Sequence, residues 1–119
     1  MNILMALSQL EITGAEVYAT TIADELIERG NKVYIVSDTL TTQTKAEYIK
    51  LEFNKRSLLK RIEHIKFLYK LIKEKDIQVV HAHSRASSWS CQVACKLAGI
   101  PLITTTHGRQ PIHFSRKLI

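Results

Sequence analysis

Residues 2–7, Asn-Ile-Leu-Met-Ala-Leu, and residues 13–16, Thr-Gly-Ala-Glu, decide the fold of this chain. The first stretch is a short apolar run typical of a buried strand, and the second opens a helix after a polar loop. Thr13 and Glu16 have the spacing of a capping box, in which each side chain accepts a hydrogen bond from the other residue's amide. A glycine loop at a helix N-terminus presents unpaired backbone amides and the positive end of the helix dipole. This stretch therefore predicts a phosphate-binding loop.

Gly14 supports two interpretations. Because it has no Cβ, a ligand oxygen can approach the main chain there. Alternatively, the glycine only lets the helix pack closely on the preceding strand.

Strand and helix patterns alternate along the rest of the chain. This alternation predicts a parallel sheet with helices on both faces, joined by right-handed crossovers. The expected fold class is α/β, a Rossmann-like doubly wound parallel sheet of about five strands. The predicted buried stripes of the first two helices include Tyr18 in one and Ile62 and Tyr69 in the other. The predicted strands are 3–7, 32–37, 47–53, 77–81 and 101–106, and the predicted helices are 14–29, 57–75 and 84–98.

The composition indicates one domain with a substantial core, since 45% of the 119 residues are hydrophobic. The sequence holds neither an apolar run of about 18 residues nor a basic segment before an N-terminal apolar run, so we expect no membrane span and no signal peptide. Cys91 and Cys95 lie four residues apart on one helix face. Without zinc-ligand spacing, they are expected to be buried thiols in a reducing compartment. These features favour a cytoplasmic protein.

Polar and ionisable residues gather where the predicted strands end, and doubly wound sheets bind ligands beyond these ends. His81 and His83, two residues apart, point to the same side of an extended strand. They make half a metal site, but the sequence offers no third clustered ligand, so we expect one to line a cleft and the other to pack. Asp38 follows the second strand and could bind ribose hydroxyls, although a complete G-x-G-x-x-G motif is missing.

Four segments together resemble the N-terminal half of group 1 retaining glycosyltransferases. The resemblance covers about residues 1–108 and implies GT-B architecture, with two Rossmann-like domains facing across a cleft. In that architecture residues 1–108 are the acceptor-side domain, and residues 109–119 begin a truncated continuation expected to be poorly ordered. The resemblance implies that the donor-binding C-terminal domain is absent from this chain, so we expect the fragment to be inactive alone. The segments are 1–5 leading to 14–16, 26–33, 76–83, and 98–108.

The resemblance also implies roles for individual residues. Gly14 and Ala15 match the positions whose amides approach the donor phosphates, although Thr13 stands where the family typically has a first glycine. His107 matches a histidine that lies against the donor sugar and is the expected catalytic residue; the alternative is a strand-end histidine without a ligand. The family usually needs no metal, and no cofactor is implied. The expected cleft-lining or acceptor residues are Glu16, His81, His83, Ser84, Arg85, Gly108 and Arg109.

The segment Lys55–Lys75 holds eight basic and two acidic residues, a charge of +6 that equals the formal net charge of the whole chain. A basic amphipathic helix can lie on anionic lipid. Because many resembling enzymes build lipid-linked glycans, we expect peripheral contact with the inner face of the plasma membrane. A solvated helix face is the alternative. Nucleic acid is not expected, because interleaved aromatics and recognition motifs are missing.

The expected function is therefore that of an N-terminal glycosyltransferase domain. The full-length enzyme would transfer a sugar from a nucleotide-sugar donor to a glycan or lipid-linked acceptor in cell-envelope synthesis. The alternative is a stand-alone Rossmann-type nucleotide-binding module.

Overall fold

The computed structural model describes residues 1–7, 14–51, 58–83 and 85–104. Within them, one parallel sheet of five strands has the order β3-β2-β1-β4-β5. The order reverses between β1 and β4, so the doubly wound parallel sheet is confirmed. The strands are β1 (Asn2–Ala6), β2 (Lys32–Ser37), β3 (Glu47–Lys50), β4 (Val79–Ala82) and β5 (Leu102–Thr104), and the helices are α1 (Gly14–Glu28), α2 (Leu58–Glu74) and α3 (Arg85–Ala98).

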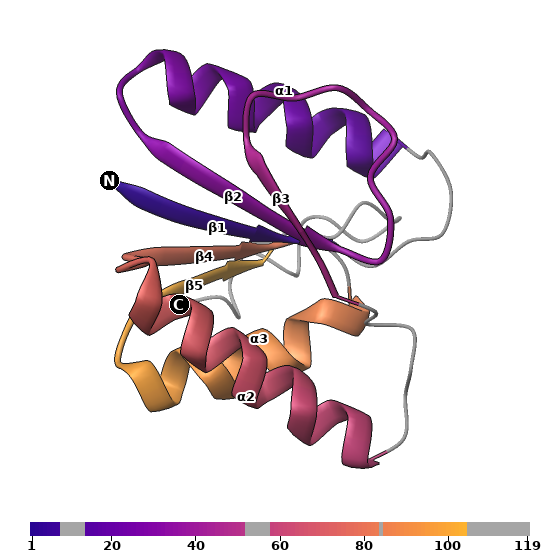
Figure 1. The fold of residues 1–119 in the computed structure, drawn as a ribbon, viewed down its shortest axis with the longest axis vertical. Coiled ribbons are helices and arrows are strands. Elements are labelled where there is room, and N and C mark those ends of the chain that lie inside the picture. Colours follow the sequence, from indigo (N-terminus) through magenta and orange to yellow (C-terminus); the bar gives the residue numbers. More distant parts are fainter. Residues whose placement is uncertain (8–13, 52–57, 84, 105–119) are drawn as a thin grey trace.

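The sheet is covered on both faces, by α1 on one side and by α2 and α3 on the other (Figure 1). Alternate residues of β1 face the two helical layers on opposite sides of the sheet, because side chains alternate along a strand. Leu4 and Ala6 join the core beneath α2 and α3, whereas Ile3 and Met5 join the core beneath α1. A strand buried on both sides must be apolar at every position, which explains the uninterrupted run at the start of the chain.

Three predicted core positions are wrong. Tyr18, Ile62 and Tyr69 are exposed. Tyr18 lies against His83, just past the end of β4, and not over the sheet. In α2 the buried face is centred on Leu68 and is rotated relative to the predicted stripe, because this helix packs on α3 as well as on the sheet. The buried positions that the pattern missed are His64 and Leu71.

Cys91 and Cys95 are free and buried in α3, as expected. Burial raises the pKa of Cys95 to about 12 and that of Cys91 further. Thiols so far from ionising are inert, which makes them core residues. Among the described residues, none of the helices combines the length and the apolar character needed to cross a bilayer.

Candidate functional site

The candidate site lies at the carboxyl edge of the sheet, at the reversal between β1 and β4. Ala6 and Ala82 are paired there, and the amide of His83 donates to the carbonyl of Ala6 at 2.8 Å. Helices α1 and α3 both begin at this edge (Figure 1). Two helices on opposite faces of the sheet therefore start on the carboxyl side (Figure 1), and helix N-termini favour anionic ligands.

Tyr18, His81 and His83 form a cluster of three rings on the α1 side of this edge. The imidazole rings of His81 and His83 lie 3.9 Å apart between centroids, which confirms that the two side chains point the same way. The Tyr18 ring meets His83 edge-on, at 6.2 Å and 71°. His83 is buried and His81 partly buried. Within the described residues no group of three or more metal-ligating side chains forms around them.

Glu16 is fully buried, and its carboxylate anchors the connection between β2 and β3. Oε2 accepts hydrogen bonds from the amides of Thr41 and Thr42, at 3.4 and 2.9 Å, and from both threonine hydroxyls. Asp24, two turns further along α1, accepts bonds from the Thr44 hydroxyl at 2.6 Å and the Lys45 amide at 2.8 Å. Two carboxylates of one helix thus hold this connection beside the candidate site.

The β2 side of the edge carries Ser37, Asp38 and Tyr48. The Tyr48 hydroxyl donates to the carbonyl of Ser37 at 3.0 Å. Burial and then the carboxylates of Asp38 and Glu16 raise the pKa of Tyr48, so its phenol stays protonated at neutral pH. Asp38 is only 3% exposed, so little of its side chain can reach a ribose.

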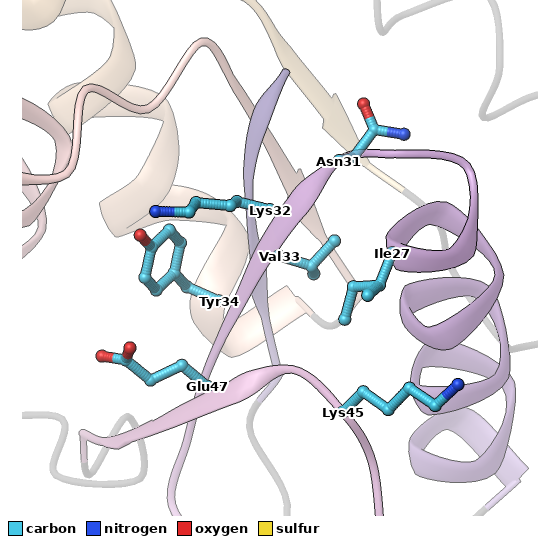
Figure 2. Close-up of a pocket in the computed structure, with 7 residues that line it drawn as sticks. All are labelled: Ile27, Asn31, Lys32, Val33, Tyr34, Lys45 and Glu47. Carbon is cyan, nitrogen blue, oxygen red and sulfur yellow. The ribbon is translucent and has the colours of Figure 1, made fainter.

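A hollow of about 210 Å³ lies at the opposite edge of the sheet, beside the start of β2 and the end of α1 (Figure 2). It is lined by Ile27, Asn31, Lys32, Val33, Tyr34, Lys45 and Glu47. Ligands of doubly wound sheets bind at the carboxyl edge, so this hollow is not the candidate site. A second open hollow, of about 470 Å³, adjoins the Asp24 contact and is lined by Asp24, Gln43, Thr44 and Lys45.

The sequence-predicted residues are only partly brought together. The structure places Glu16, His81 and His83 at the carboxyl edge, but Glu16 presents no accessible surface there. Helix α1 starts at Gly14 and Ala15 and α3 starts at Arg85, all at this edge. Sequence reasoning missed Tyr18 as a site residue. Its spacing in the helix predicted a core position, whereas its ring lies next to His83. The remaining candidates, Thr13, Ser84, His107, Gly108 and Arg109, lie outside the described residues.

The model of Glycosyltransferase Family 4 matches residues 12–118. The chain belongs to this family. Its sequence is 31% identical over 74 residues to the UDP-Gal:alpha-D-GlcNAc-diphosphoundecaprenol alpha-1,3-galactosyltransferase of Escherichia coli, a match covering 61% of this chain and 19% of that enzyme. The predicted family resemblance is therefore confirmed.

Solved structures agree with the predicted fold. A glycosyltransferase from Rickettsia africae superposes with a TM-score of 0.82 and 25% identity over 98% of this chain and 32% of its own. MurG of Acinetobacter baumannii gives a TM-score of 0.71 and 13% identity over 99% of this chain and 39% of its own. The predicted fold, the N-terminal Rossmann-like half of a GT-B glycosyltransferase, is confirmed. The chain spans about a third of these structures and about a fifth of the curated relative.

Proposed function

We propose that this chain is the acceptor-side domain of a retaining glycosyltransferase that moves a sugar from a nucleotide-sugar donor to a lipid-linked or envelope glycan. One observation carries the proposal: in a family 4 chain, α1 and α3 both begin on the carboxyl side (Figure 1), where the strand order reverses, and Tyr18 and His81 keep accessible surface there. A nucleoside diphosphate leaving group gains negative charge during transfer. Fixed amides and helix dipoles stabilise such charge with little reorganisation.

The family resemblance implies a role for each part of the site. The amides at Gly14 and Ala15 would face the donor phosphates, and His107 would contact the donor sugar. A second domain would hold most of the nucleotide, and no metal is required in this scheme. The location would be cytoplasmic, next to the membrane that carries the acceptor.

The test is sugar transfer by the full-length protein. We expect transfer from one of a panel of nucleotide sugars, beginning with UDP-galactose, to an acceptor carrying GlcNAc-diphosphate on a shortened prenyl chain, because the Escherichia coli relative's name specifies these groups. Mass spectrometry of the lipid product detects transfer. Nucleotide binding without transfer to any lipid-linked or glycan acceptor would instead support the stand-alone binding module.

The exposed surface of α2 and α3 supports membrane contact. Leu59, Ile62 and Trp89 are 76%, 42% and 45% exposed. The Arg61 guanidinium lies 5.4 Å from the Trp89 ring centroid, so cation and aromatic ring share this surface. Exposed apolar side chains among lysines distinguish it from a merely solvated charged face. Helix α3 begins beside the carboxyl edge, which would bring a lipid-linked acceptor close to the candidate site (Figure 1).

We expect the full-length protein to bind vesicles containing anionic phosphatidylglycerol and to bind neutral phosphatidylcholine vesicles at least about 10-fold more weakly, since each nearby cation contributes about 1 kcal/mol. The double variant Leu59→Ser/Trp89→Ala should weaken binding to the anionic vesicles about 10-fold by removing apolar insertion. Leu97→Ser, an equally exposed change at the far end of α3, is the control and should not alter binding. Co-sedimentation measures all three. Binding to oligonucleotides but not to vesicles would contradict the membrane proposal.

A further inference from the structure

Tyr18 occupies an unexpected position for an aromatic residue of an amphipathic helix. Its ring is 47% exposed, whereas Ala19 and Ala23 on the same helix are fully buried against the sheet. An exposed ring loses the stabilising free energy that a tyrosine buried in the core would contribute. The side chain lies at the carboxyl edge, one turn from the start of α1. An exposed aromatic ring at a predicted ligand edge is a candidate contact for a ligand.

The three-ring cluster is held in place from its centre. His83, 2% exposed, meets the Tyr18 ring edge-on and also contacts the His81 ring. The backbone of His83 is fixed by its hydrogen bond to Ala6 in the central strand. The two outer rings, Tyr18 and His81, keep accessible surface. A buried imidazole thus positions two accessible rings that come from different elements, which makes the surface preorganised.

Resting on the proposed function, we infer that the ring cluster Tyr18–His83–His81 is a subsite for the pyranose ring of the acceptor, with Tyr18 as a specificity-determining residue. One face of a pyranose carries C–H groups that pack against an aromatic ring. The surrounding hydroxyls need neutral donors and acceptors, and a tyrosine hydroxyl and an imidazole supply both. Such mixed apolar and polar lining is typical of small-ligand sites.

The charges around the ring cluster favour an acceptor sugar that is linked to a diphosphate. The nearest carboxylates described at this edge, Glu16 and Asp38, are buried at 0% and 3% exposure. The accessible side chains of the cluster are neutral or, for histidine, able to become cationic. An anionic linkage beside the sugar therefore meets the helix N-termini and an imidazole rather than an exposed acid.

The test uses the full-length protein with UDP-galactose as the donor probe and the GlcNAc-diphosphate prenyl compound as the acceptor probe. We expect Tyr18→Ala to raise the acceptor KM about 10-fold, with donor hydrolysis in the absence of acceptor unchanged. Tyr18→Leu, which keeps apolar bulk without a flat ring, should behave the same way. Tyr18→Phe should stay within about three-fold of the parent protein, because it retains the ring. Tyr69→Ala, which removes an exposed tyrosine from α2, is the matched control and should leave both values unchanged.

The outcomes separate this inference from the proposed function. If the parent protein transfers sugar and both Tyr18→Ala and Tyr18→Leu keep its acceptor KM, the subsite is overturned and the glycosyltransferase function stands. A proportional loss of donor hydrolysis and transfer, with no change in acceptor KM, also overturns the subsite, because it marks a general structural effect. If the parent protein transfers sugar from none of the nucleotide sugars to any lipid-linked or glycan acceptor, both proposals fall.

Discussion

Glu16→Ala is expected to destabilise this domain by about 3 kcal/mol, because a buried donor left without its partner costs about 1–3 kcal/mol. Four donors from Thr41 and Thr42 converge on one carboxylate oxygen of this fully buried side chain. Thr41 is exposed, so water can compensate part of the loss there. Truncation also leaves a cavity beneath the connection from β2 to β3. The expected cost is therefore well above that of an ordinary surface substitution.

Urea denaturation of the full-length protein measures the loss, and hydrogen exchange of a peptide covering residues 38–46 locates it. Glu16→Gln should be intermediate, because it keeps one carbonyl oxygen but places an NH₂ group among donors. Glu25→Ala is the matched control on the same helix. Its carboxylate pairs with Arg29 at 2.9 Å, but both side chains are exposed, so the change should be within about 0.5 kcal/mol. Equal destabilisation by the Glu16 and Glu25 variants would contradict the anchoring role of Glu16.

The Glu16 contact also shows what the sequence could not predict. The spacing of Thr13 and Glu16 predicted a local cap, which stays a prediction because Thr13 lies outside the described residues. The structure adds two partners of Glu16 that the spacing did not indicate, Thr41 and Thr42, some 25 residues away. Local spacing carries no information about a loop that returns to the helix from a different strand. In contrast, the helix boundaries were predictable because caps, glycines and apolar periodicity are local. The position of Gly30 after α1 is one example, with a φ of 95° that favours glycine.

The candidate site was predictable in one respect and not in another. The two-residue spacing of His81 and His83 fixed their common direction, since side chains alternate along an extended backbone. Tyr18 could not be placed, because helical periodicity says which face of a helix is apolar but not where the helix passes the end of the sheet. The register between β1 and β4 places His83 at the end of the sheet, where its ring contacts the ring of Tyr18.

His107→Ala in the full-length protein is expected to lower kcat about 100-fold, the typical cost of losing one preorganised hydrogen-bond donor at a reacting group. The reason is positional. β5 pairs with β4 so that Thr104 lies beside Ala82, and His107 follows Thr104 by three residues in the sequence. The chain therefore leaves the sheet at the same carboxyl edge, one strand from the reversal. The family resemblance independently assigns this histidine to the donor sugar.

The measurement is initial-rate sugar transfer at saturating donor and acceptor, with urea denaturation to check that the variant folds. His107→Asn should recover part of the rate, because an amide N–H can donate in place of the imidazole. His113→Ala is the matched control, since it removes a second histidine from the same C-terminal stretch that the resemblance does not assign to the site. An unchanged kcat in a folded His107→Ala protein, or an equal loss in His113→Ala, would remove His107 from the catalytic machinery. A loss specific to His107 would instead support its contact with the donor sugar, just past the carboxyl end of β5 and on the side of the sheet where α1 and α3 begin (Figure 1).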